Sequence, residues 1–221
     1  MSFSIPDYVN VFLDKFAKKH APSISIKQKS QSNLMKILSF LVKPFNPKFD
    51  QYITTIGTTI YVPDNFFNKK PIQIIEVLSH ETKHAKDFYN HPFLFICGYL
   101  FPQILFLPLL ILLLAVGCKL WSLFALILLT PIPAYFRFKS ELVAYRTSLL
   151  IAENVFVYPI KEVQKIKDWI IEQLTKRWYY WAFPFPSYIQ NELNDSSYKI
   201  EPFYLDLLAF IKSNKQSLQL N

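Results

Sequence analysis

Two histidines and a glutamate, arranged as His80-Glu81-x-x-His84, are the residues of this chain best suited to chemistry. On an α-helix, residues four apart lie on one face with their Cβ atoms about 5 to 6 Å apart, so His80 and His84 can bind one tetrahedral zinc ion. Glu81 is turned partly off that face, where it can take a proton from a water molecule instead of binding the metal. This division of labour is what a metalloprotease requires.

The surrounding segment, residues 71–89, predicts the helix that this geometry needs. Pro71 suits a first helical turn, and the apolar residues before the motif cluster with helical spacing; they are Ile74, Ile75, Val77 and Leu78. The alternative is an amphipathic helix whose histidines and glutamate merely face solvent.

A zinc ion held by two histidines needs a third protein ligand and an open position for water. We predict Glu141, which stands near the start of an apolar helix and is followed by Leu-Val-Ala-Tyr. An acidic residue is favoured at that end of a helix. Three other residues remain open as the third ligand: Asp87, Glu153 and His91.

Between the histidine pair and Glu141 lies the most apolar part of the chain. Residues 93–118 and 120–136 carry no charge, and Lys119 alone separates them. Because about 20 apolar residues cross a bilayer, the two runs predict a transmembrane helical hairpin that brings Glu141 back beside His84. Basic residues flank the histidine side of the hairpin, which favours a catalytic domain on the cytoplasmic side. A buried or re-entrant hairpin is the alternative.

The remaining elements indicate an α+β fold that is mostly α. Residues 51–63 are rich in Ile, Thr, Tyr and Val and predict a strand, or two strands meeting at Gly57, whose edge can hold an extended peptide. A short strand is expected at 23–27, and helices at 5–19, 32–42, 161–176 and 202–212. The predicted organisation is an N-terminal part with the histidine helix (1–92), the membrane hairpin (93–136) and a helical C-terminal part (137–221).

Composition excludes several classes of protein. The formal charge of +8 is spread along 221 residues without a basic run or a nucleic-acid motif, so we expect no nucleic-acid partner and assign the surplus to lipid headgroups. Cys97 and Cys118 lack metal-type spacing and are expected to be structural. The N-terminal segment has no long apolar core and is not expected to be a signal peptide.

The order of motifs resembles a known group of enzymes. The histidine motif, an apolar helical insertion and a helix containing ExxA are similar to gluzincin metallopeptidases, most closely the integral-membrane CAAX-protease and HtpX-like class. The segments TTIGTTIYVP, HETKH, FLFICGYLFPQ and ELVAY also resemble an uncharacterised bacterial and phage family. The resemblance implies a zincin-like small sheet, His80, His84 and Glu141 as zinc ligands, and Glu81 as general base.

These expectations combine into a membrane-associated zinc endopeptidase that acts on peptide or protein. Tyr145 and Arg146 are candidates for donating a hydrogen bond to the oxyanion that forms during hydrolysis. Tyr145 stands where the ExxAD pattern of the CAAX proteases has aspartate. The alternatives are a catalytically silent zincin-fold protein with a structural or interaction role at a membrane, and a membrane-remodelling factor.

Overall fold

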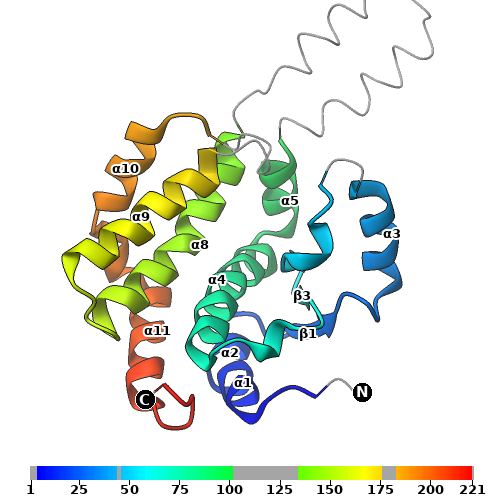
Figure 1. The fold of residues 1–221 in the computed structure, drawn as a ribbon, viewed down its shortest axis with the longest axis horizontal. Coiled ribbons are helices and arrows are strands. Elements are labelled where there is room, and N and C mark those ends of the chain that lie inside the picture. The colour runs from blue at the N-terminus through cyan, green and yellow to red at the C-terminus, as the bar shows by residue number, and fades with distance from the viewer. Residues whose placement is uncertain (1–3, 44–45, 102–133, 176–182, 221) are drawn as a thin grey trace, which may run out of the picture.

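The computed structural model describes residues 4–43, 46–101, 134–175 and 183–220. Most of these residues are helical, and a three-stranded sheet completes the fold (Figure 1). The longer elements are α1 (Asp7–Phe12), β1 (Ser25–Gln28), α3 (Asn33–Val42), β2 (Thr54–Ile56), β3 (Thr59–Val62), α4 (Pro71–Asn90), α5 (Pro92–Leu100), α8 (Tyr135–Asn154), α9 (Ile160–Thr175), α10 (Pro186–Asn194) and α11 (Pro202–Ser213). Short turns link them: a π-helical turn at Leu13–Ala17, α2 (Lys18–His20) and 3-10 turns at Phe49–Gln51, Phe66–Asn68 and Ser197–Ile200.

The sheet has the order β1-β3-β2, with β3 in the centre. β1 pairs with β3 in parallel, and β2 pairs with β3 antiparallel, with Thr55 opposite Ile60. A tight turn at Gly57 joins β2 to β3, and its φ of 63° is a conformation that glycine adopts without steric cost. The predicted pair of strands meeting at Gly57 is therefore confirmed, and β2 forms an edge of this sheet.

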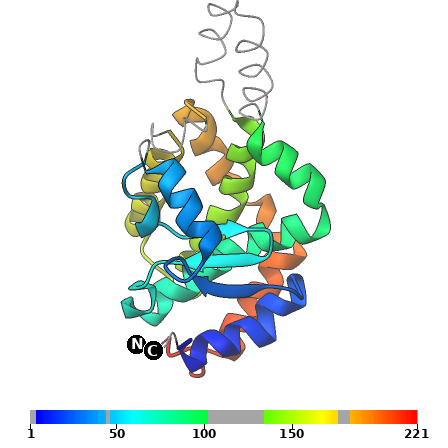
Figure 2. The same ribbon diagram turned by 90° about the vertical axis from the view of Figure 1, so that its right-hand side faces the viewer.

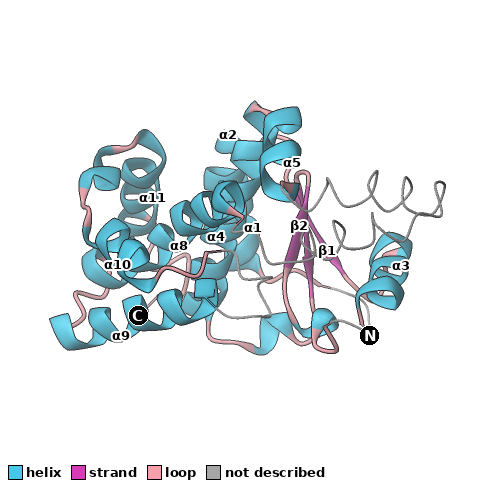
Figure 3. Cartoon of the chain, turned by 90° about the horizontal axis from the view of Figure 1, so that it is seen from above, coloured by secondary structure: helices cyan, strands magenta, loops and turns pink. Residues whose placement is uncertain are grey.

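The helices pack in layers beside the sheet, as the view from above shows (Figure 3). α4 lies between the strands and α8. The helices α9, α10 and α11 lie on the α8 side of α4, and α3 stands on the other side of the strands. In Figure 2 the N-terminal helices run along the bottom of the molecule beside α11, where the Phe12 and Phe210 rings are 5.8 Å apart. The N-terminal and C-terminal parts of the chain therefore share one core.

Helix α8 is buried on more than one face and contributes to two apolar clusters. Leu150 and Ile151 join the core formed with the sheet, α1, α4 and α11. Phe138 and Leu142 join a second apolar cluster with α9 and α10. A helix that is apolar on several faces is stable only when neighbours cover all of them, and these two clusters fix the position of α8 against α4.

The structure corrects the predicted membrane hairpin at 93–136. Its first residues form α5, which has only nine residues and is about 14 Å long, against the roughly 30 Å of a bilayer core. Across the four described stretches, no helix combines the length and apolar character needed to cross a membrane. Residues 102–133, with Lys119 and Cys118, lie outside the described residues. The predictions of a hairpin-interrupted fold and of an integral-membrane location are therefore wrong for the part of the chain that is described.

Candidate metal centre

Three side chains converge on one point between α4 and α8: His80, His84 and Glu141. The two imidazole Nε2 atoms are 3.2 Å apart, and each lies 3.5 Å from Oε2 of Glu141. Ligand atoms about 2.0 to 2.1 Å from a tetrahedral ion lie about 3.3 Å from one another. The three separations match that value, so this group can hold a metal ion.

The group forms because two helices present the right faces to each other. His80 and His84 are one turn apart on α4, as the motif predicts, and Glu141 lies in the second turn of α8, which packs along α4. All three side chains are largely shielded, with exposed side-chain fractions of 12%, 8% and 2% in that order. The prediction that Glu141 returns to the histidine pair is confirmed.

Mutual electrostatics stabilise the charged forms of Glu141 and His84. Burial alone would raise the pKa of Glu141, but the two histidines outweigh burial and hold this pKa well below its usual range. Burial would likewise lower the pKa of His84, and the Glu141 carboxylate reverses that effect and raises it. A cation shared by all three side chains would replace the imidazolium charge as the partner of this buried carboxylate.

The other oxygen of Glu141 is engaged by Tyr99 on α5. The Tyr99 hydroxyl donates a hydrogen bond of 2.6 Å to Oε1, which leaves Oε2 facing the histidines. Burial and the nearby negative charge of Glu141 raise the pKa of Tyr99 well above its ordinary value, so the hydroxyl keeps its proton. The Arg137 side chain anchors this tyrosine by donating from Nε to its backbone oxygen at 3.0 Å.

Two further contacts orient the remaining parts of the centre. The Ser140 hydroxyl lies 3.3 Å from Nδ1 of His84, the ring nitrogen that does not face the group. On the sheet side, the Thr55 hydroxyl donates a hydrogen bond of 2.6 Å to Oε2 of Glu81. Such contacts fix the tautomer of a histidine ligand and the direction of a carboxylate. Glu81 is therefore held next to the edge strand β2 and outside the group of three ligands.

Tyr145 and Arg146, the predicted oxyanion donors, have different surroundings. The Tyr145 ring packs edge to face against His80, with centroids 4.7 Å apart, and against Trp169 of α9 at 5.6 Å. Arg146 points the other way, where its Nη2 donates to the backbone oxygen of Glu192 at 2.8 Å. Of these two predicted donors, Tyr145 is the one that contacts the candidate metal centre.

The three other candidates for the third ligand lie elsewhere. Asp87 accepts two hydrogen bonds from Lys83, at 2.7 and 2.8 Å, and Glu153 pairs with Lys199. His91 is exposed between α4 and α5, where it lines a cavity of about 280 Å³ together with Asp87 and Tyr99. None of the three belongs to the group that converges on the metal position.

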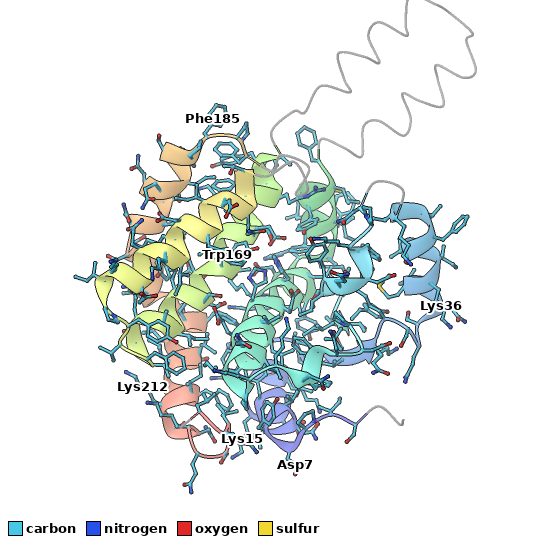
Figure 4. All side chains as sticks on the ribbon, in the orientation of Figure 1. Asp7, Lys15, Lys36, Trp169, Phe185 and Lys212 are labelled. Carbon is cyan, nitrogen blue, oxygen red and sulfur yellow. The ribbon has the colours of Figure 1, made fainter. Side chains whose placement is uncertain are left out.

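A second hollow opens beside the N-terminal half of α4, on the Tyr145 side of the centre. It has a volume of about 320 Å³ and is lined by Glu76, Tyr158, Glu162, Lys165, Ile166 and Trp169. We call it the Trp169 groove; Trp169 lies on the side of α9 that faces α4 (Figure 4). Burial raises the pKa of Glu76, while the Ser148 side chain and His80 act in the opposite direction.

Sequence reasoning missed Tyr99, Thr55 and Ser140. It assigned Tyr99 to an apolar membrane run, although Phe95 and Tyr99 are one helical turn apart and their rings stack with centroids 5.6 Å apart. Ser140 directly precedes Glu141, and this adjacency was the available signal. Nothing in the sequence pairs Thr55 with Glu81, because their contact depends on how the sheet meets α4.

The chain matches no family model, no curated protein and no solved structure. Its likeness to the gluzincin peptidases therefore rests on the motifs alone.

Proposed function

We propose that this protein is a zinc-dependent endopeptidase whose metal is held by His80, His84 and Glu141. The observation that carries the proposal is the set of three ligand-atom separations, 3.2, 3.5 and 3.5 Å, in a largely buried position. Two imidazoles and one carboxylate form a common donor set for catalytic zinc, which keeps its remaining position for water or substrate. Zinc bound there would supply a Lewis acid that polarises a water molecule and a substrate carbonyl.

The same donor set also suits iron in oxygenases, and Glu81 favours hydrolysis instead. Its carboxylate follows the first histidine directly, stays out of the ligand group and is oriented by Thr55. In the proposed reaction Glu81 accepts a proton from the attacking water while the water oxygen bonds to the carbonyl carbon. Glu81 then gives that proton to the leaving nitrogen as the peptide C–N bond breaks.

The position of strand β2 favours a peptide as the substrate. It forms an edge of the sheet, and its central residue, Thr55, touches the proposed base. An extended peptide that pairs with such an edge gains backbone hydrogen bonds and lies along the strand. This placement would set the scissile bond beside Glu81. Tyr145, packed on His80, is the residue that we propose as the donor to the oxyanion.

Metal content and cleavage of an unstructured protein substrate test the proposal together. We expect about one zinc ion per purified chain, its loss in His80→Ala, and its retention in Glu81→Gln with cleavage reduced at least 100-fold. If the unaltered protein binds zinc but does not cleave the substrate, the result would instead support a catalytically silent zincin-fold protein. Equal cleavage by Glu81→Gln and the unaltered protein would contradict the assigned role of Glu81.

A further inference from the structure

The Trp169 groove adjoins the candidate metal centre through residues of α4 and α9. On α4, Glu76 precedes His80 by one helical turn, a spacing that places side chains about 5 to 6 Å apart at Cβ. On α9, Trp169 packs on Tyr145, and Tyr145 packs on His80. The groove is therefore within reach of a side chain near the scissile bond of a peptide bound at the proposed centre.

The lining of the groove combines negative charge with aromatic faces. Tyr158 and Trp169 are 44% and 49% exposed, so their rings are open to a ligand. Lys165 is paired with Glu162 at 2.7 Å, so its positive charge is already matched within the groove. Glu76 supplies a further carboxylate that is partly removed from water. Such a carboxylate is stabilised by a cation, and aromatic faces attract ammonium and guanidinium groups.

We propose that the Trp169 groove is a specificity subsite that takes a lysine or arginine side chain of the peptide. Glu76 would bind the cationic head, and Trp169 and Tyr158 would cover its planar or aliphatic part. Arginine is favoured over lysine, because a guanidinium pairs with a carboxylate through two hydrogen bonds and stacks on aromatic rings. The inference rests on the proposed peptidase function, whose active site lies next to this groove.

Cleavage of matched peptides tests the subsite. The peptides differ at one position near the scissile bond, which carries arginine or its uncharged, unbranched counterpart norleucine. We expect the unaltered protein to favour arginine about tenfold in kcat/KM, and Glu76→Gln to bring that ratio close to one. Asp168→Asn is the matched control, because it removes a charge from an exposed position of α9 outside the groove and should keep the ratio. A missing arginine preference, or one that Glu76→Gln retains, would overturn the subsite.

A binding measurement separates this inference from the hydrolysis on which it rests. Glu81→Gln protein, which is expected to bind peptide without cleaving it, is titrated with the same two peptides while tryptophan fluorescence is followed. We expect about tenfold tighter binding of the arginine peptide and a fluorescence change that is lost when Trp169→Phe is added. If Glu81→Gln protein prefers the arginine peptide but the unaltered protein cleaves neither peptide, the subsite would be retained and the peptidase function rejected. Equal binding of both peptides would reject the subsite, whatever the catalytic result.

Discussion

The Tyr99 hydroxyl donates a 2.6 Å hydrogen bond to Oε1 of Glu141, while Oε2 of the same carboxylate faces both histidines. This contact links α5 to the proposed metal ligand on α8. Because it occupies one oxygen, it favours binding of a metal through the other oxygen alone. We therefore predict that Tyr99 positions Glu141, the proposed third ligand.

Replacing Tyr99 with phenylalanine should weaken zinc binding by about 10- to 100-fold, the range seen when a partner of a metal ligand is lost. The ring remains to stack on Phe95, so the fold should persist. Competition with a calibrated chelator measures the affinity. Tyr89→Phe, which alters an exposed tyrosine near the end of α4, is the control. Equal zinc affinity in both variants would show that the hydroxyl does not position Glu141.

Thr55→Val should reduce kcat by about three- to tenfold without lowering zinc content. The substitution keeps the shape of the side chain but removes the hydrogen bond that directs the Glu81 carboxylate. The loss should stay below the 100- to 10,000-fold that a missing general base costs, because Glu81 itself remains. Steady-state kinetics with metal analysis measures both effects. Thr55→Ser, which retains a hydroxyl, should recover most of the rate; failure to recover would argue against orientation by this contact.

The stability of the protein should fall in mild acid because of His20. Burial, assisted by the charge of Lys86, lowers the pKa of this histidine to about 4, although Asp206 acts in the opposite direction. The unfolded chain, with a pKa near 6.5, therefore binds the proton first as the pH falls. Between about pH 6.5 and pH 4, the free energy of unfolding should decrease by about 2.5 kcal/mol from this residue.

Urea unfolding at several pH values measures this effect, and His20→Gln should flatten the decline. His91→Gln is the matched control, because His91 is exposed and its removal should leave the slope unchanged. A slope that is equal in all three proteins would exclude His20 as its source.

Leu142→Ala should lower the free energy of unfolding by about 2 to 5 kcal/mol, because it leaves a cavity in the cluster between α8, α9 and α10. Leu142 is fully buried, whereas Leu205 on α11 is 52% exposed. Leu205→Ala should therefore change the stability by no more than about 0.5 kcal/mol. Chemical denaturation compares the two variants, and similar losses would contradict the described packing of α8.

The histidine pair of the candidate metal centre could be predicted because local rules set its geometry. Helical spacing alone places His80 and His84 on one face, and the apolar pattern of residues 71–89 predicts the helix that carries them. The Gly57 turn and the two short strands around it likewise follow from local composition. The choice of Glu141 rested in addition on its place near a helix start and on a membrane hairpin that would return the chain to the histidine helix. Glu141 does lie beside the two histidines, but no described helix supports the hairpin.

The remainder depends on tertiary packing that a sequence pattern does not contain. The run after residue 92 has the composition of a membrane helix, yet its first part forms α5, which packs on α4 and α8 and directs Tyr99 at Glu141. Apolar composition alone does not distinguish these two uses of a helix. Thr55 contacts Glu81, and Glu76 and Trp169 line the same groove, because separate elements pack together. No spacing along the chain predicts these two relationships.

The most direct test of the proposed metal centre is a crystal structure of the zinc-loaded protein with anomalous diffraction recorded at the zinc absorption edge. We predict a single zinc peak within about 2.0 to 2.2 Å of Nε2 of His80, Nε2 of His84 and a carboxylate oxygen of Glu141. A zinc ion bound elsewhere, or one bound by the histidines while the Glu141 carboxylate stays outside its coordination sphere, would contradict the account.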